Sequence, residues 1–347
     1  MRKVVLAALL AGALLSIVGC GGDSGSSSQD PVEQVSSEGG LRENVRAAQQ
    51  VKASDFPSAE GKTLQQVAQE VKGGGKVEAG LASSVFTVGE SRFAFGMIDD
   101  QGQFVYGPTA VYVAPDPNQP AQGPFPAPAD VLITEGRYRS RQAAEETDPF
   151  AAVYESQVRF DKKGPWAVLV VTKSGNSYVA APAQVQVTTK NADTIPEVGD
   201  SPPKVATDTL ASVKGDEKLL DTRVPPSDMH KDSLEKVLGK KPVALLFSTP
   251  QLCQSRVCGP VTDVALQLKA KYGDRIEFIH QEVYANTDPK AGLRPPLQAF
   301  HLRTEPWLFV INAQGKITAR LEGSFGITAF DNALKTCKQA KSARGGN

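Results

Sequence analysis

Two cysteines carry the most legible chemistry in this sequence of 347 residues. They lie in the run Cys253-Gln-Ser-Arg-Val-Cys258-Gly-Pro260. A thiol that loses its proton becomes a nucleophile, and two neighbouring thiols can form a reversible disulfide. The apolar residues 243–247 before the pair are typical of a strand, and residues 260–272 after it have helical spacing. Because backbone N–H groups at a helix N-terminus stabilise a thiolate, this position favours redox chemistry.

The spacing of the pair predicts which sulfur is more reactive. At about 100° per residue, cysteines five apart on one regular helix would face different ways, and a proline is best tolerated at the first helical position. We therefore expect the helix to begin near Cys258, with Cys253 looping back to meet it. Cys258 would then have the lower pKa and attack first. An alignment on the strand end instead makes Cys253 the nucleophile, and a third interpretation is a permanent structural disulfide.

The elements that would position the pair alternate between strand and helix over residues 226–341. The predicted strands span residues 243–247, 276–283, 307–312 and 316–321, and the predicted helices span residues 233–238, 260–272, 292–301 and 328–337. This alternation indicates parallel pairing of the first two strands, whereas the turn at residues 313–315 indicates an antiparallel hairpin. Cys337 falls on the apolar stripe of the last helix, where we expect a buried, inert thiol.

The position of the cysteine pair, the order of these elements and the segment Thr304-Glu-Pro306 resemble the thioredoxin-like superfamily of thiol-disulfide oxidoreductases. The resemblance implies an α/β thioredoxin-like fold in which Pro306 is a cis-proline. Its loop, with Glu305 and Thr304, would abut the disulfide and accept a partner's extended backbone. The sequence departs from the family's Trp-Cys-Gly-Pro-Cys in its spacing and in having Leu252 before the first cysteine. Glu305 is unusual, since a carboxylate near the thiols would raise their pKa.

A copper-binding family of the same fold, which serves cytochrome oxidase assembly, uses two cysteines and a histidine. Its histidine would fall at Thr304 here, and the three histidines of the sequence are His230, His280 and His301. A copper-chaperone-like activity is therefore the weaker alternative, and we expect neither a metal nor a cofactor at the pair.

The N-terminus predicts the compartment. Met1-Arg-Lys3 is basic, residues 4–18 are apolar but short for a membrane span, and Ile17-Val-Gly-Cys20 resembles the lipobox of bacterial lipoproteins. The resemblance implies that residues 1–19 are a cleaved signal peptide and that Cys20 carries acyl chains such as palmitate. These would anchor the protein in the bilayer at the extracytoplasmic face of the bacterial cell membrane, where disulfides persist. The alternative is an ordinary secretory signal with a chance cysteine, or an uncleaved anchor.

Between the N-terminal region and the cysteine-bearing region, apolar residues recur with the period of a β-strand. Residues 77–190 alternate apolar and polar side chains between turn signals, which predicts an immunoglobulin-like all-β sandwich. Within it, the proline-rich residues 114–128 are expected to form an irregular, exposed loop. The remaining segments are predicted to be a flexible tether (20–55), a short helical segment (56–76), a Pro-rich linker (191–225) and a tail (342–347).

The composition argues against a nucleic-acid-binding function. Lys plus Arg and Asp plus Glu both number 38, so no net charge attracts nucleic acid. The sequence predicts a membrane-anchored, extracytoplasmic protein that performs thiol-disulfide exchange through Cys258 and Cys253. Its partners would be exported cysteine-containing proteins or a membrane electron donor. The alternative is a redox-silent thioredoxin-like lipoprotein that acts as a binding or scaffold module with a structural disulfide.

Overall fold

The computed structural model describes residues 30–71, 76–141, 143, 150–190, 192, 194–253 and 255–337. The expected signal peptide, Cys20 and the tail at residues 342–347 lie outside these residues. Residues 31–337 belong to one compact unit. None of the described helices has the length and apolar character that a membrane span requires.

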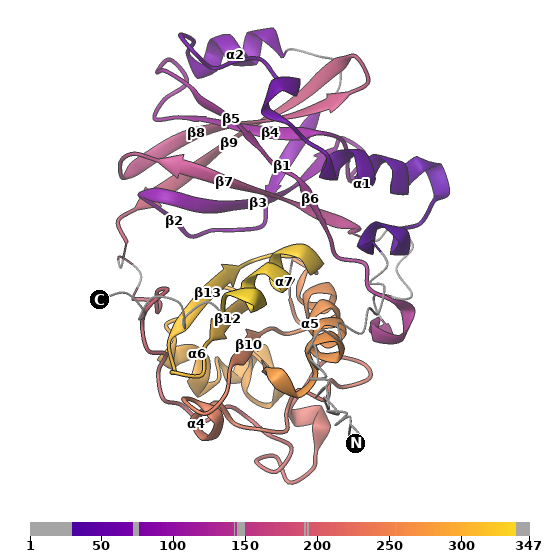
Figure 1. The fold of residues 1–347 in the computed structure, drawn as a ribbon, viewed down its shortest axis with the longest axis vertical. Helices are drawn as coiled ribbons and strands as arrows, with labels where there is room; N and C mark the ends of the chain where they lie inside the picture. Colours follow the sequence, from indigo (N-terminus) through magenta and orange to yellow (C-terminus); the bar gives the residue numbers. More distant parts are fainter. Residues whose placement is uncertain are drawn as a thin grey trace, which may run out of the picture. The chain divides into compact units, whose positions relative to one another are not determined.

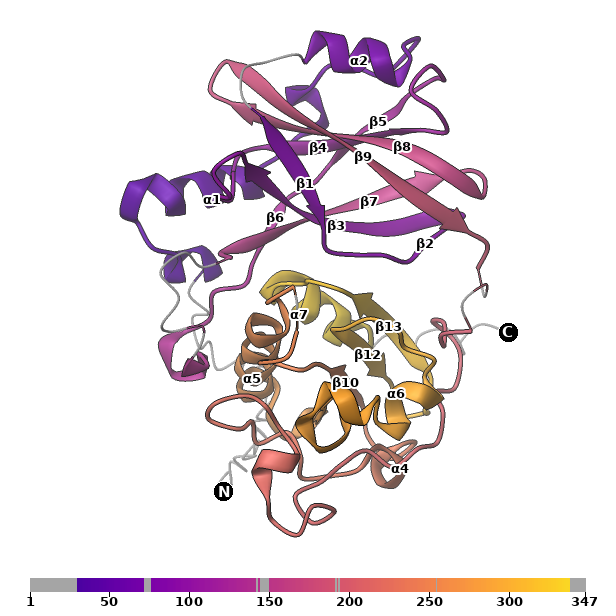
Figure 2. The ribbon, with the colours of Figure 1, turned by 180° about the vertical axis from the view of Figure 1, so that it is seen from behind.

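The N-terminal half is built from two β-sheets (Figures 1 and 2). One sheet has the strand order β1-β3-β7-β6, and the other has the order β2-β9-β8-β4-β5. The strands are β1 (Val77–Leu81), β2 (Phe86–Thr87), β3 (Gly89–Asp99), β4 (Thr109–Ala114), β5 (Gln122–Pro126), β6 (Ala129–Val131), β7 (Ala152–Phe160), β8 (Gly164–Ser174) and β9 (Ser177–Thr188). Neighbours are antiparallel except β2 and β9, which are parallel. The predicted β-rich character of this half is confirmed.

Alternating side chains of both sheets fill one apolar core. In β7, Tyr154, Val158 and Phe160 are buried in this core, whereas Gln157 and Arg159 are exposed. Successive side chains of a strand point to opposite faces, so the period of two places one face inside. The same core holds side chains of β3, β4, β8 and β9.

Residues 30–55 are folded against the sandwich, which corrects the expectation of a flexible tether there. Val32, Val45 and Ala48 are fully buried in the sandwich core. The elements of this segment are η1 (Pro31–Gln34), η2 (Glu38–Gly40), α1 (Leu41–Gln49) and η3 (Ala53–Asp55). A few apolar side chains at the right spacing are enough to hold a segment whose composition is otherwise polar.

The short helix predicted next forms as α2 (Leu64–Glu70). Its N-terminus has a capping box: the Gln66 N–H donates to the Thr63 hydroxyl, and the Thr63 N–H donates to the Gln66 side chain. The helix packs Val67 against side chains of β4 and β8. The expectation of an irregular loop over residues 114–128 is wrong in part, because β5 pairs with β4 as an edge strand, where prolines are tolerated.

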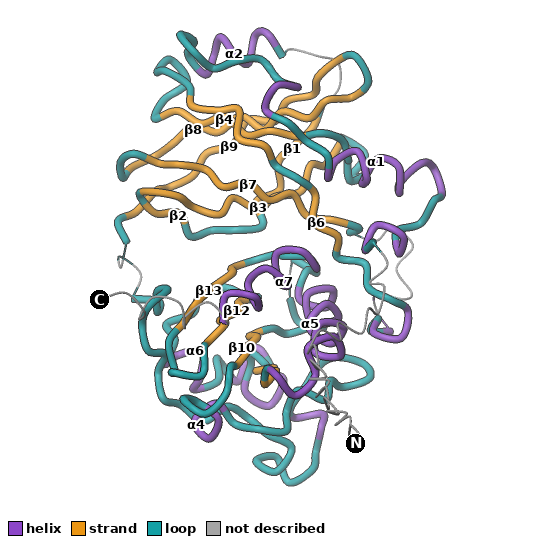
Figure 3. Tube along the Cα trace, in the orientation of Figure 1, coloured by secondary structure: helices purple, strands orange, loops and turns teal. Residues whose placement is uncertain are grey.

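The C-terminal half has a four-stranded sheet of order β11-β10-β12-β13, with helices on both faces (Figure 3). Its elements are α4 (Leu234–Val237), β10 (Val243–Phe247), α5 (Cys258–Tyr272), β11 (Glu277–Gln281), α6 (Pro295–Ala299), β12 (Trp307–Ile311), β13 (Ile317–Glu322) and α7 (Ile327–Lys335). Strands β10 and β11 are parallel, and β12 is antiparallel to both β10 and β13. The parallel pair β10–β11 and the antiparallel pair β12–β13 agree with the sequence-based prediction.

Strand β10 is apolar throughout because it separates two cores. Leu245 and Phe247 pack with residues of α4 and α6, whereas Ala244 and Leu246 pack with residues of α5 and α7. Cys337 is buried at the end of the second core, as predicted for an inert thiol, and its Sγ donates to a carbonyl one turn earlier.

A carboxylate from the sandwich caps a helix of the C-terminal half. Asp130 in β6 accepts the N–H groups of Gly326, Thr328 and Ala329 at 2.9, 2.8 and 2.9 Å. The first N–H groups of α7 have no partner inside the helix, so this side chain satisfies them from outside. A Cβ at Gly326 would lie 2.5 Å from the Val131 carbonyl oxygen, so the two halves approach closely here.

A second set of contacts joins the end of β13 to the sandwich. The Arg92 guanidinium donates to the carbonyl oxygens of Glu322 and Ser324. The Ser84 N–H and hydroxyl donate to the Glu322 carboxylate at 2.7 and 2.6 Å. A Cβ at Gly323 would overlap the Ala82 carbonyl oxygen. These contacts fix the segment that follows β1 beside the C-terminal sheet.

Candidate thiol site

The loop between β10 and α5, here called the thiol loop, carries Cys253, and Cys258 follows it directly. Helix α5 begins at Cys258, where the spacing predicted it. The Cys253 N–H donates to the Thr249 carbonyl (3.2 Å), and the Arg256 N–H donates to the Cys253 carbonyl (3.3 Å). These turns fold the loop back on itself, so Cys253 and Cys258 pack in one small apolar cluster.

The two thiols differ in acidity. Cys258 is fully buried and Cys253 is 8 % exposed, and both are free thiols. A hydrogen bond from the Cys258 thiol is the largest cause that lowers the pKa of Cys253 to about 6, and the Ser255 hydroxyl, 3.2 Å from its sulfur, adds to it. Burial raises the pKa of Cys258 well above its ordinary value, and its contact with Cys253 raises it further. The thiolate therefore resides on Cys253.

This order corrects the expectation that Cys258 has the lower pKa. The first residue of α5 does feel the helix N-terminus, and the Thr249 N–H donates to its sulfur. Burial outweighs these effects, because a charge removed from water loses its solvation. The alternative assignment, with Cys253 as nucleophile, agrees with the observed order.

The loop of Thr304, Glu305 and Pro306, here called the proline loop, lies beside the thiols. The Glu305–Pro306 peptide bond is cis, as the resemblance implied. Burial first, and then the negative charge of Cys253, raise the pKa of Glu305 to about 6. Glu305 in turn raises the pKa of Cys258, the direction expected for a carboxylate near the thiols. It is therefore more than a surface charge.

The third residue of this loop has a structural role. The Thr304 hydroxyl accepts a hydrogen bond from the Trp307 indole N–H (3.0 Å) and donates one to the Glu322 carboxylate (3.3 Å). Since Glu322 also accepts from Ser84 of the sandwich, Thr304 links the proline loop to the contact between the halves.

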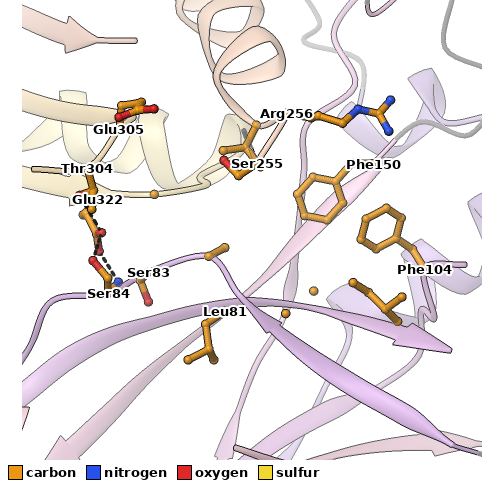
Figure 4. A pocket seen from close by; sticks show the side chains of 16 residues that line it. Leu81, Ser83, Ser84, Phe104, Phe150, Ser255, Arg256, Thr304, Glu305 and Glu322 are labelled. Carbon is orange, nitrogen blue, oxygen red and sulfur yellow. Dashed lines mark hydrogen bonds between the residues drawn. The ribbon is translucent and has the colours of Figure 1, made fainter. Parts of the chain in front are cut away.

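Two hollows flank the thiol loop, and Arg256 lines both. The larger, of about 350 Å³, lies between the thiol loop, the proline loop and the sandwich (Figure 4). It is lined by Gly80, Leu81, Ala82, Ser83, Ser84, Gly96, Ile98, Phe104, Phe150, Ser255, Arg256, Val257, Thr304, Glu305, Glu322 and Gly323. The smaller, of about 300 Å³, is lined by Cys253 among others. Cys253 thus lines one hollow, and a mainly apolar hollow lies on the other side of Arg256.

A buried polar group could hold a metal. Among the residues that the structure describes, Asp221, His230 and His280 are the only group of three or more His, Cys, Asp or Glu side chains with this arrangement. They could offer two imidazole nitrogens and a carboxylate oxygen to a divalent cation. Here Asp221 Oδ2 lies 3.0 Å from His230 Nε2 and 3.3 Å from His280 Nδ1, and it accepts the Ser227 N–H at 2.7 Å. Neither cysteine belongs to this group.

Sequence reasoning named Cys253, Cys258, Pro306, Glu305 and Thr304, and the structure brings all five to one region. Sequence reasoning missed three other groups at the site: the Ser255 hydroxyl, the Thr249 N–H and the sandwich residues that line the larger hollow. The serine could have been found, because a hydroxyl two residues after a cysteine can reach its sulfur. No sequence signal marks the sandwich residues, which the fold alone brings to the site.

No family model matches the sequence, and no curated protein matches it. Among solved structures, one assigned as a thiol:disulfide interchange protein DsbE from Chlorobium tepidum is 16% identical, with a TM-score of 0.30, over 41% of this chain and 98% of that chain. A thioredoxin family thiol:disulfide interchange protein from Chlorobium tepidum TLS is 16% identical, with a TM-score of 0.28, over 41% of this chain and 97% of that one. Both similarities leave more than half of this chain uncovered.

Proposed function

We propose that the chain performs thiol-disulfide exchange through Cys253 and Cys258. The Cys253 thiolate attacks one sulfur of a partner disulfide, so a mixed disulfide forms and the other partner sulfur leaves as a thiolate. Cys258 then loses its proton and attacks the Cys253 sulfur, which releases the second partner thiolate. The partner gains two electrons, and the Cys253–Cys258 pair loses them in becoming a disulfide. The reverse sequence oxidises a dithiol partner.

One observation carries this proposal: two free thiols that pack in one cluster and have opposite pKa shifts lie beside the loop of Glu305 and Pro306. With a pKa of about 6, Cys253 is mostly thiolate at neutral pH, whereas Cys258 keeps its proton. An exchange enzyme needs one thiolate to attack and one thiol held in reserve. Perturbed ionisation in a solvent-accessible hollow is also what marks functional sites in general.

The exchange assay uses the reduced full chain and a chromogenic aromatic disulfide. Wild type should reduce the disulfide, Cys253→Ser should lose the activity, and Cys337→Ser should keep it, since that thiol is buried away from the pair. Equal rates for wild type and Cys253→Ser would show that the pair does not exchange.

We further propose that the N-terminal half is an immunoglobulin-like sandwich. The order β1-β3-β7-β6 corresponds to strands A-B-E-D of that fold, and β9-β8-β4-β5 corresponds to G-F-C-C′. Strand β2 is then a short addition that pairs in parallel with the last strand. Both strand orders support this assignment independently.

We also propose an extracytoplasmic site of action with a lipid anchor on Cys20. The basic start, the apolar residues 4–18 and the lipobox-like residues before Cys20 support it. Exported cysteine-containing proteins or a membrane electron donor would be the partners, because disulfides persist in that compartment. Cys20→Ser should leave the protein unprocessed or release it from membranes. Recovery of that variant in a lipid-modified membrane form would contradict the anchor.

The hollow between the halves favours a second candidate function, a binding module whose cysteine pair is redox-silent. Such a module would hold a partner through the hollow and would use the cysteines only as a structural clip. The two functions differ in the assay above, because a redox-silent module reduces no disulfide and yet binds its partner when both cysteines are replaced by serine.

A further inference from the structure

The apolar hollow next to the thiol loop has one wall from each half of the chain. The thiol loop contributes Val257, whereas the sandwich contributes Ile98 from β3 and Phe104. Phe104 and Phe150 lie side by side at the hollow, whereas the Leu81 side chain points away from it (Figure 4). The side chains of Ile98, Phe104 and Phe150 are half-buried. Partly exposed apolar side chains along the wall of such a hollow indicate a place for an apolar group.

An aromatic pair connects this hollow to the reactive cluster. The rings of Phe104 and Phe150 are 4.5 Å apart, and Phe150 also packs against the cluster of Cys253 and Cys258. A Cβ at Gly96 would lie 3.2 Å from the Phe104 ring and 3.5 Å from the Phe150 ring, so glycine at this position leaves room for the pair. The apolar lining is therefore continuous from the sandwich to the thiols.

The sandwich wall is held in place. Ser84 bonds to Glu322, and the Ser324 N–H donates to the Ala82 carbonyl at 3.1 Å. Together with the cap that Asp130 makes on α7, these contacts fix the end of β1 against the C-terminal half. A preformed hollow needs no ordering when a ligand enters, which favours binding.

We propose that this hollow binds an apolar side chain next to the reactive cysteine of the exchange partner, so the sandwich selects substrates. The proposal rests on the exchange function above. The occupant is an extended segment of the partner polypeptide with Leu, Ile, Val or Phe one or two positions from its cysteine. Its cysteine meets Cys253 in the smaller hollow, and its apolar neighbour passes Arg256 into the larger one. The two hollows share Arg256 as a lining residue, so adjacent residues of one extended strand can occupy both.

The test compares two disulfide-linked peptides that differ only in Leu or Ser beside the cysteine, with the reduced full chain as enzyme. The readout is the ratio of kcat/KM for the two peptides, which cancels any general change in thiol reactivity. We expect wild type to prefer the Leu peptide by about tenfold, as a partly open apolar pocket allows. Ile98→Ser should lower this ratio about threefold or more, and Ile98→Trp, which fills the hollow, should abolish the preference.

Leu219→Ser and Leu219→Trp are the matched controls, because Leu219 is 38% exposed and lies outside both hollows. Both should keep the wild-type ratio. A wild-type ratio near one, or an unchanged ratio in both Ile98 variants, would overturn the proposal while exchange itself stands. Failure of wild type to reduce either peptide or the aromatic disulfide would instead overturn the exchange function and this proposal with it.

Discussion

Replacing Cys258 by alanine removes the hydrogen bond that contributes most to the low pKa of Cys253. We expect the pKa of Cys253 to rise from about 6 toward its ordinary value of 9.0, because burial still opposes ionisation, although the Ser255 hydroxyl and the backbone N–H groups of Ser255 and Cys258 still favour it. A full return to 9.0 corresponds to roughly 4 kcal/mol. Cys258→Ser is the matched control: it keeps an O–H donor at the same place and should change the pKa by less than about one unit.

The effect on reactivity combines two opposing changes. At pH 5, a rise of about three units lowers the thiolate fraction roughly 900-fold. A more basic thiolate is also a stronger nucleophile, by roughly 16- to 32-fold at a Brønsted coefficient of about 0.4–0.5. For a full return to 9.0, the net slowing of alkylation is therefore up to about 60-fold at pH 5 and up to about 6-fold at pH 7. Above about pH 8 the variant should react faster than wild type.

The assay is alkylation of the reduced full chain by iodoacetamide over a wide pH range, with Cys253 and Cys258 followed separately by mass spectrometry. Crossing rate profiles for wild type and Cys258→Ala, with Cys258→Ser close to wild type, are the expected result. A midpoint that stays near pH 6 in Cys258→Ala would refute the reasoning, since the thiol contact would not then be the cause. Faster alkylation of Cys258 than of Cys253 in wild type would refute the order of the pair.

Three further outcomes follow from the same geometry. Cys258→Ser should trap partners as mixed disulfides on Cys253, whereas Cys253→Ser should trap none; the opposite pattern, seen on non-reducing gels, would exchange their roles. Glu305→Gln should lower the pKa of Cys258 and speed resolution of a mixed disulfide above about pH 6, where the Glu305 carboxyl is ionised, but not below it, where both side chains are neutral. Equal resolution rates at all pH values would contradict this. Asp130→Asn should lower the free energy of unfolding by about 1–3 kcal/mol, because the amide NH₂ faces backbone N–H donors of α7. Urea unfolding checks it, with exposed Asp161→Asn as control, and equal stability of the two variants would argue against the cap.

The regular elements were predictable because their periods are strong. Strand β10 forms over the residues whose pattern indicated it, and α5 begins at the cysteine where the proline and the spacing placed it. The segment at residues 30–55 was mispredicted because Val32, Val45 and Ala48 are few among polar neighbours, although each is fully buried. Local composition cannot show that a distant sheet will cover them.

The site was predictable in its members but not in its electrostatics. Helix position argued for a thiolate on Cys258, and the sequence gives no measure of how deeply that sulfur is buried. Burial decides which cysteine has the lower pKa. The free energy needed to remove the Cys258 thiolate from water exceeds the stabilisation that a helix N-terminus provides. The Asp130 cap and the hollow lined by Ile98 and Val257 join residues far apart in the chain, so only the fold reveals them.

The reduction potential of the Cys253–Cys258 pair tests the central claim most directly. It can be measured on the full chain by equilibration with dithiol–disulfide buffers and quantification of the free thiols. A low-pKa thiolate in the reduced state stabilises that state and raises the potential, so an exchange pair should lie above about −300 mV. A value clearly below about −300 mV would identify a structural disulfide and contradict the exchange function.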